Sequence, residues 1–183
     1  MTKKIIGIAG SLRQGSYNAA LLRAAAELAP ASVTIEIASI RGIALYDGDV
    51  EAQGIPEVVA QLKDRIATAD ALLLVTPEYN NSIPGVFKNA IDWLSRPPAD
   101  IPRVFAGRKV AVMGASPGRF GTLLSQTAWM AVIRTLGMQP WYGASLYLSA
   151  ANTVFDSLGK LTDAATKERL IQFLSKFAEF VAH

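Results

Sequence analysis

The sequence of 183 residues lacks cysteine entirely and contains one histidine, His183, which is its last residue. Without thiols the chain can form no disulfide, no thiolate nucleophile and no cysteine-ligated metal site. A metal site would have to be built from carboxylates or His183, and a Ser-His-Asp relay would need this terminal imidazole. Any chemistry therefore has to come from hydroxyls, lysines, carboxylates, backbone amides or a bound cofactor.

The sequence is also short of charge. Charged residues make up 18% of the chain, below the usual ~25% of soluble proteins. This shortage suggests that another subunit covers part of the surface. The net charge is +3 and the longest basic run is Lys3-Lys4, so we expect no nucleic-acid partner, although a mild positive bias suits an anionic ligand.

Long apolar runs are missing too. No stretch approaches the ~20 apolar residues of a membrane span, and the run that follows Lys4 is too short for the core of a signal peptide. We therefore expect a protein that is soluble and cytoplasmic, with no membrane partner.

Short apolar runs alternate with helical patterns along the whole chain. Strands are expected at residues 5–9, 33–38, 71–75, 109–113 and 141–148. Helices are expected at residues 17–28, 56–68, 84–94, 120–136 and 164–181, with loops at 41–54 and 96–107. This alternation predicts a single α/β domain over 1–183, with a three-layer, doubly wound, five-stranded parallel sheet. Ligands of such sheets bind beyond the carboxyl ends of the strands.

The loop after the first strand has the composition of an anion site. It runs from Gly10 to Asn18 and leads directly into a helix, whose first amides lack partners and attract anions. Hydroxyl, amide and guanidinium groups surround those amides, from Ser11, Arg13, Ser16 and Asn18. Ser16 and Tyr17 stand where a Walker A motif has its lysine and its magnesium-binding hydroxyl, which leaves a monophosphate site. An ordinary N-capped loop without a ligand is the alternative.

The loop after the third strand is stiff and carries an aromatic side chain. Thr76 to Gly85 includes two prolines, and Tyr79 offers a ring face against which a planar ligand could lie. Asn80 and the loop amides could bond the edge of a heterocycle. The alternative is that this segment is only rich in turn-forming residues.

The loop after the fourth strand matches a hydrolase motif literally. Gly114-x-Ser116-x-Gly118 has the G-x-S-x-G spacing of a nucleophile elbow. Pro117 has no N–H to form half of an oxyanion hole, and the only imidazole is His183. We therefore reject a serine hydrolase.

Two loop motifs can be compared with known families. The first is Gly10-Ser11-Leu12-Arg13…Ser16-Tyr17-Asn18, and the second runs from Thr76-Pro77-Glu78-Tyr79-Asn80-Asn81-Ser82-Ile83-Pro84-Gly85 to Trp93. Both closely resemble those of the NAD(P)H-dependent FMN reductases. These flavodoxin-like flavoproteins include bacterial chromate and quinone reductases and related azoreductases. The resemblance covers essentially the whole chain and implies strand order 2-1-3-4-5 with noncovalently bound FMN. The sequence differs from the family's frequent pattern at Ala44, where relatives often have proline. Substrate preference is therefore the property that can least be carried over from the family to this chain.

The resemblance also implies roles for individual residues. The phosphate of FMN would be held by Ser11, Arg13, Ser16 and Asn18, next to Tyr17. The flavin ring would be lined by Pro77, Glu78, Tyr79 and Asn80 from one loop, and by Ser116, Gly118 and Gly121 from the other. Arg119 would contact the phosphates of the nicotinamide dinucleotide or a partner subunit.

The activity that follows from the resemblance needs no catalytic side chain and no metal. A hydride would pass from NAD(P)H to flavin N5, and two electrons would then go to a quinone, chromate, an azo or nitro compound or a flavin. The resemblance slightly favours NADPH as co-substrate. A one-electron carrier of the flavodoxin type and a non-catalytic flavin-binding protein remain alternatives.

The resemblance further implies a homodimer or homotetramer that associates through residues 84–94 and 120–136. Phe87, Trp93 and Trp129 lie in these predicted helices and suit either that interface or the core.

Overall fold

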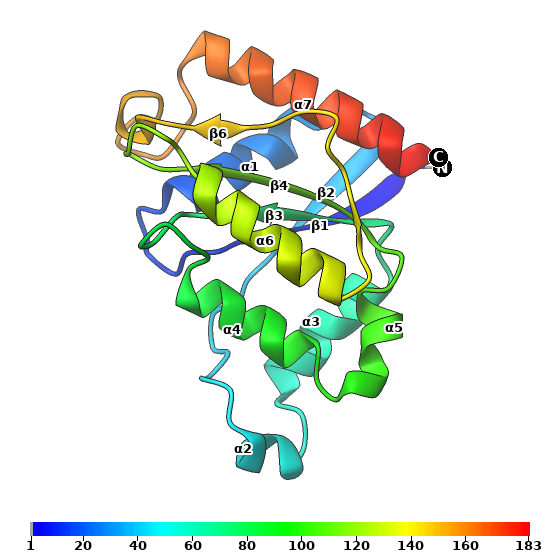
Figure 1. Ribbon diagram of the computed structural model, residues 1–183. Helices are drawn as coiled ribbons and strands as arrows, with labels where there is room; N and C mark the ends of the chain where they lie inside the picture. The colour runs from blue at the N-terminus through cyan, green and yellow to red at the C-terminus, as the bar shows by residue number, and fades with distance from the viewer. Residues whose placement is uncertain (1) are drawn as a thin grey trace.

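The computed structural model describes residues 2–183 as a parallel sheet with helices on both faces (Figure 1). The strand order is β2-β1-β3-β4-β5, and β6 pairs with β4 beyond the end of β5. The predicted doubly wound, flavodoxin-like architecture and its strand order are thus confirmed.

The strands are β1 (Lys3–Ala9), β2 (Val33–Ala38), β3 (Ala71–Val75), β4 (Lys109–Ala115), β5 (Gln139–Pro140) and β6 (Tyr147–Leu148). The helices are α1 (Tyr17–Leu28), α2 (Gly48–Ala52), α3 (Glu57–Ala67), α4 (Gly85–Leu94), α5 (Ile101–Val104), α6 (Leu123–Thr135) and α7 (Ala164–Ala182). Two 3-10 turns, η1 (Pro98–Asp100) and η2 (Ala151–Thr153), complete the elements. No helix within residues 2–183 is both long enough and apolar enough to cross a membrane.

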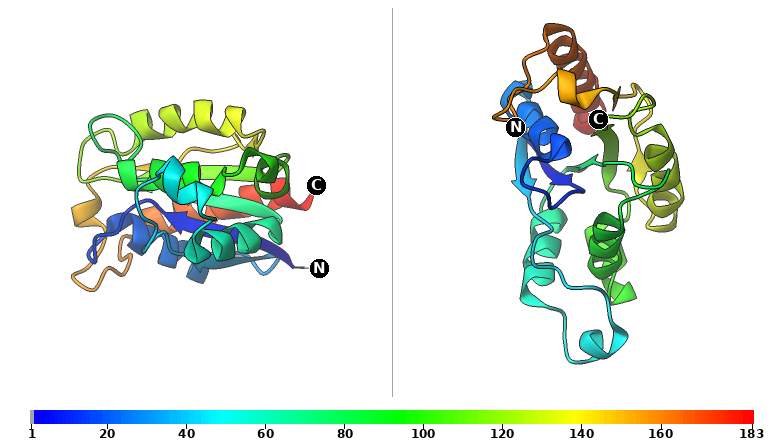
Figure 2. Two further views of the ribbon diagram at one scale, coloured as in Figure 1. Left: turned by 90° about the horizontal axis from the view of Figure 1, so that it is seen from below. Right: turned by 90° about the vertical axis from the view of Figure 1, so that its left-hand side faces the viewer.

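Each face of the sheet carries its own apolar core. Leu21 of α1 and Phe177 of α7 pack on one face, and α3, α4 and α6 cover the other. β3 lies between β1 and β4, so its five residues are all buried, which explains its unbroken apolar run. Both views in Figure 2 show the same three layers. Phe87, Trp93 and Trp129 are fully buried in the second core, so they are core residues and do not form a subunit interface.

The predicted fifth strand over residues 141–148 is wrong in extent. In this part of the chain only the two-residue strands β5 and β6 pair with β4, and the chain between them bows away from the sheet edge. The Trp141 ring turns beneath α7, where its centroid lies 5.0 Å from that of Phe173 and 5.4 Å from that of Phe177. A Cβ on Gly143 would lie 2.5 Å from the Trp141 indole nitrogen, so the bow depends on glycine there. The half-buried indole packs against the core, and the N–H of Trp141 still donates to the Val110 carbonyl at 2.8 Å, so the chain leaves the sheet only after this residue.

The two segments predicted as loops contain short helices. In residues 41–54, Asp47 caps α2 by accepting a hydrogen bond from the N–H of Asp49 at 2.9 Å. In residues 96–107, the prolines occupy first-turn positions of η1 and α5, where a missing N–H does no harm. Proline-rich loops are usually exposed, but Val104 and Phe105 in this segment are fully buried.

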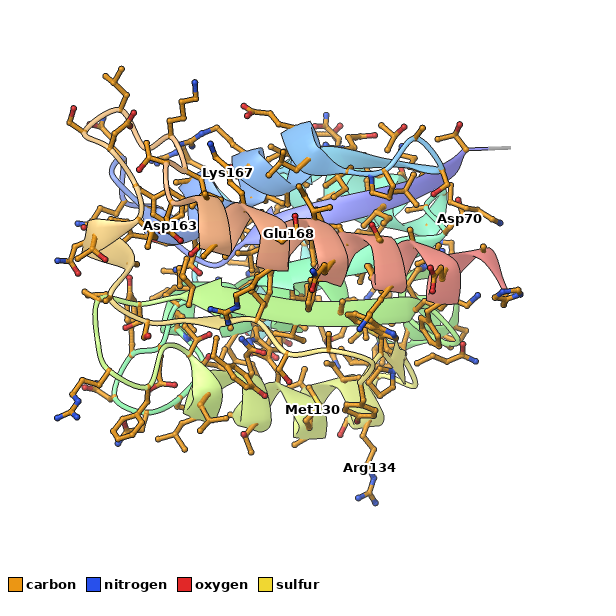
Figure 3. The ribbon with its side chains drawn as sticks, turned by 90° about the horizontal axis from the view of Figure 1, so that it is seen from above. Asp70, Met130, Arg134, Asp163, Lys167 and Glu168 are labelled. Atoms are coloured by element: carbon orange, nitrogen blue, oxygen red, sulfur yellow. The ribbon has the colours of Figure 1, made fainter. Side chains whose placement is uncertain are left out.

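A carboxylate ties the amino-terminal ends of β1 and β3 together. The Lys3 ammonium donates to Asp70 at 2.9 Å and the backbone N–H of Lys4 donates at 2.8 Å. Burial acts to raise the pKa of Asp70, but these two hydrogen bonds outweigh it and hold the pKa below its ordinary value. Figure 3 shows Asp70 at the opposite end of the molecule from Asp163.

Candidate active site

Three loops meet where the central strands end. Ala9, Val75 and Met113 lie side by side in register near the carboxyl ends of β1, β3 and β4. The loops that follow gather at one edge of the sheet, at the left in Figure 1. This is the edge at which doubly wound folds bind ligands.

The first loop presents unpaired donors. The Ser16 hydroxyl caps α1 by accepting from the N–H of Ala19 at 3.2 Å. The backbone N–H groups of Tyr17 and Asn18 bond to no group within residues 2–183. Arg13 folds back beside them, donating to the Gly15 carbonyl at 2.6 Å, with its guanidinium 5.4 Å from the Tyr17 ring centroid. These free amides, the helix dipole and the guanidinium together suit an anionic group.

The side chain of Asn18 has a structural role between two loops. It is 3% exposed, and its amide group donates to the Ala115 carbonyl at 2.8 Å and accepts from the Ala115 N–H at 2.9 Å. β3 ends before it can pair with this last residue of β4, so the Asn18 side chain takes the place of the missing peptide group. The side chain thereby joins the first loop to the third. That Asn18 holds the phosphate stays a prediction, which its free backbone N–H supports.

The second loop is a small hairpin. The N–H of Tyr79 donates to the Ser82 carbonyl at 3.2 Å, and the N–H of Ser82 donates back at 3.0 Å. Asn80 and Asn81 have φ values of 49° and 62°, so both central residues adopt the left-handed conformation of a type I′ turn. Tyr79 remains 51% exposed beside the cavity, whereas Asn80 lies at the turn tip and does not line it.

Two side chains fix this hairpin to α6. The Glu78 carboxylate accepts from the N–H of Ser125 at 3.0 Å, in the first turn of α6, where the helix dipole favours an anion. The fully buried Thr76 hydroxyl lies 2.9 Å from the Ser125 hydroxyl and accepts from the Trp129 indole N–H at 3.1 Å. The hairpin is therefore held in a defined position.

The third loop curls over β6. The Ser116 hydroxyl accepts from the N–H of Gly118 at 3.1 Å. Gly121 has φ +60°, and a Cβ there would lie 2.9 Å from the Tyr147 carbonyl carbon, so this glycine is required by the backbone. That Gly121 contacts a ligand stays a prediction, beside this structural role. Arg119 is exposed at the loop tip.

One cavity of about 330 Å³ lies between the three loops, within the range for small-molecule sites. Nine of the thirteen residues predicted from the sequence line it: Ser11, Arg13, Ser16, Tyr17, Asn18, Pro77, Glu78, Tyr79 and Ser116. The other four do not: Asn80, Gly118, Arg119 and Gly121. Sequence reasoning missed Ala115 and Pro117 in the wall. Pro117 could have been found, because it follows Ser116 directly, but the backbone role of Ala115 leaves no mark in the sequence.

The arrangement excludes the hydrolase motif a second time. The carboxyl terminus, and with it His183, lies at the end of the sheet opposite the loops (Figure 1). No group of three or more His, Asp and Glu side chains suited to a metal ion gathers in the part of the chain that the structure describes.

The cavity suits a planar ring that carries a phosphate. Two free helix amides, two serine hydroxyls and a guanidinium stand at one end, and an exposed tyrosine ring at the other. An unpaired donor pair of this kind calls for an anionic partner. Fold and cavity together define a flavodoxin-like protein with a site for a flavin mononucleotide.

Comparison with known proteins identifies the family within this fold class. The profile of the NADPH-dependent FMN reductase family matches residues 3–153. An NAD(P)H-dependent FMN reductase of Pseudomonas aeruginosa is 46% identical over 93% of this chain and 91% of its own. A 2-hydroxy-1,4-benzoquinone reductase of a Burkholderia species is 38% identical over 99% and 97%.

Solved structures agree. The flavoenzyme NAD(P)H:(acceptor) oxidoreductase of Paracoccus denitrificans superposes with a TM-score of 0.88 at 33% identity, over 99% of this chain and 98% of its own. The chain belongs to the NADPH-dependent FMN reductase family. It is an oxidoreductase whose cofactor is FMN and whose electron donor is NAD(P)H.

Proposed function

We propose that residues 1–183 form one flavin-binding domain that passes two electrons from NAD(P)H to a quinone. The observation that carries this proposal is the convergence of nine predicted residues from three loops on one cavity. Relatives named for quinone reduction, at 38% and 40% identity over nearly the whole chain, support the choice of acceptor. The use of NAD(P)H supports a cytoplasmic location.

Each wall of the cavity has a proposed role. The free N–H groups of Tyr17 and Asn18, with Ser11, Ser16 and Arg13, bind and orient the phosphate. Pro77, Glu78 and the Tyr79 ring hold the planar ring system in place along the second loop, and Ser116 and Pro117 close the opposite side. When bound, FMN supplies the chemistry, accepting a hydride from NAD(P)H and delivering two electrons to the acceptor.

Proton balance requires no side-chain base. The nicotinamide gives up two electrons and one proton as hydride, and the quinone takes up two electrons and two protons as it becomes the hydroquinone. The second proton comes from solvent, since the cavity opens beside the exposed Tyr79. Exposed Arg119 follows Pro117 of the cavity wall by two residues, and its positive charge would attract the phosphates of the incoming dinucleotide.

The test is steady-state oxidation of NADPH by 1,4-benzoquinone with FMN-loaded protein. We expect catalytic turnover and parallel-line kinetics, because donor and acceptor use the same cavity in succession. The visible absorbance of the bound flavin should bleach when NADPH is added without oxygen, and it should return when quinone is added. A protein that binds FMN but shows neither turnover nor bleaching would be a carrier or a flavin-binding protein, and the reductase proposal would fail.

We also propose a homodimer or homotetramer that forms through α4 and α6. Val86 on α4 and Leu123 and Leu124 on α6 are exposed apolar residues, and Phe120 just before α6 is 74% exposed. A hollow of about 340 Å³ lies between the two helices. Apolar surface of this kind is typical of association sites.

The assembly proposal is tested by light scattering after gel filtration. The variant Leu124→Glu should shift the protein toward the monomer, whereas Ile171→Glu, an equally apolar and exposed position on α7, should not. A wild-type protein that elutes as a monomer at micromolar concentration would overturn it.

A further inference from the structure

Two further hollows follow α1 away from the flavin cavity. The first, of about 300 Å³, shares Ser16 and Tyr17 with that cavity. The second, of about 470 Å³, shares Ala20, Arg23, Leu158 and Gly159 with the first. The three hollows therefore succeed one another along α1, starting from the residues that face the phosphate.

Cationic side chains without partners line these hollows. Arg23, Lys160 and Lys167 form no ion pair or side-chain hydrogen bond with any described residue. Arg23 instead lies across the loop that follows η2, because its Nη2 is 2.9 Å from the position a Gly159 Cβ would take. Figure 3 shows Lys167 in the first turn of α7, alongside α1.

Two carboxylates also belong to the walls. One oxygen of Asp156 accepts from the N–H groups of Leu158 at 2.9 Å and Lys160 at 2.8 Å, so its charge is engaged within its own loop. Glu27 stands one turn beyond Arg23 at the far end of the larger hollow. The stretch around Arg23 and Lys160 is thus the cationic part.

The far hollow has an apolar side as well. Leu28, Leu158 and Leu161 line it, and Leu158 is 88% exposed, which is unusual for a leucine with no partner to cover it. Arg23 lies seven residues after Ser16, or about 10 Å along the helix axis. Arg23 and Leu158 line both hollows, and the far one adds Lys160 and two further leucines, so cationic and apolar walls run together along the groove. A nucleoside diphosphate presents matching groups, because its phosphates are anionic and its base offers an apolar face.

We propose that this groove binds the adenylyl half of a flavin dinucleotide, so that the protein accepts FAD as well as FMN. The inference rests on the proposed function, because it takes the flavin phosphate to lie at the start of α1. From that point the second phosphate and the ribose reach Arg23 and Lys160, and the adenine covers Leu158. A separate NAD(P)H molecule has to place its nicotinamide against the flavin ring, at the Tyr79 end, so it is not the ligand that starts here.

The experiment measures dissociation constants of FMN and FAD for the apoprotein, from quenching of flavin fluorescence. The double variant Arg23→Gln/Lys160→Gln removes two exposed charges whose side chains bond to no residue within 2–183, so folding is preserved. FAD affinity should fall about tenfold or more, as expected for losing charge-assisted contacts. FMN affinity should change less than threefold.

The matched control is Arg169→Gln/Lys176→Gln, which removes one arginine and one lysine from exposed positions of α7 outside the hollows. This control variant should alter neither the FMN nor the FAD dissociation constant. An equal response of FAD to both double variants would overturn the proposal. The proposal would also fail if Arg23→Gln/Lys160→Gln left the FAD dissociation constant unchanged and raised the KM for NADPH, because the groove would then bind the nicotinamide dinucleotide. A wild-type protein that fails to bind FMN would instead defeat the proposed function itself.

Discussion

Replacing Asn18 by alanine should detach the first loop from the third. The buried side chain holds both the N–H and the carbonyl of Ala115, and alanine leaves both without a partner. A hydrogen bond contributes about 1 kcal/mol net, and leaving a buried polar group unsatisfied costs about 1–3 kcal/mol. We expect the free energy of unfolding to fall by roughly 2–4 kcal/mol. For a chain of this length that corresponds to a fall in Tm of roughly 5–15 °C.

Urea unfolding of the apoprotein, followed by circular dichroism and tryptophan fluorescence, measures this change. Asn152→Ala is the control, because that asparagine is exposed and its side chain forms no hydrogen bond within residues 2–183; it should cost less than about 0.5 kcal/mol. If Asn18→Ala costs no more than this control, the side chain does not act as the missing strand residue and the reasoning is refuted.

The variant Asn18→Asp refines the test. Its ionised carboxylate can still accept from the Ala115 N–H, but its second oxygen faces the Ala115 carbonyl, where a donor is needed. The protonated form supplies that donor, so the pKa of the introduced carboxyl should be raised in the folded variant. Stability should therefore be highest at low pH and be lost as pH rises through that pKa. An Asn18→Asp protein with no such trend would contradict the assigned geometry.

Three further outcomes are expected. Gly121→Ala should cost at least about 1–2 kcal/mol in urea unfolding, because a side chain at φ +60° is strained and meets the Tyr147 backbone. Asp70→Asn should reduce stability at pH 7, where the wild-type carboxylate is ionised against Lys3. The deficit should shrink as pH falls through the lowered pKa, measured by urea titrations from pH 7 to pH 3. Glu78→Ala should weaken FMN binding by loosening the hairpin from α6, as seen by fluorescence titration.

Each of these outcomes has its own check. Gly118→Ala, in the same loop as Gly121 but without a left-handed φ, should cost less than about 0.5 kcal/mol. A flat difference between Asp70→Asn and wild type across the pH range would show that the ion pair contributes nothing. Glu78→Gln keeps an acceptor for Ser125, so it should bind FMN better than Glu78→Ala; equal loss in both would point to the charge itself.

The alternation of strands and helices and the location of the site could be read from the sequence because both depend on local signals, whereas the strand order followed from the family resemblance. Ala71–Val75 is apolar without a break, as a strand covered on both faces must be, and Ser16 marks the start of α1 as its cap. The nine predicted residues of the cavity followed from polar loops placed at strand ends together with the family resemblance, which alone gave Ser116 its role. Such loops converge once the sheet is parallel, whatever the details of their packing.

The features that the sequence did not predict depend on contacts between distant segments. Trp141 lies in a run that reads as a strand, and only its packing against α7 shows why the chain leaves the sheet. The pairing of the Asn18 side chain with Ala115 crosses 97 residues, so the sequence gives no sign of it. The left-handed φ of Asn80, which places it at the tip of a tight turn, cannot be told from residue type alone.

The interruption between β5 and β6 has a consequence for how the protein behaves in concentrated solution. An outer strand with a long row of open N–H and carbonyl groups is a template on which another chain can add a strand. Here the outer strand consists of two pairs of residues, one of them containing Pro140, which has no N–H, and the chain between them bows outward. The rim of the sheet beyond β4 therefore offers no straight edge to a neighbouring molecule, and the fold protects itself there against ordered aggregation.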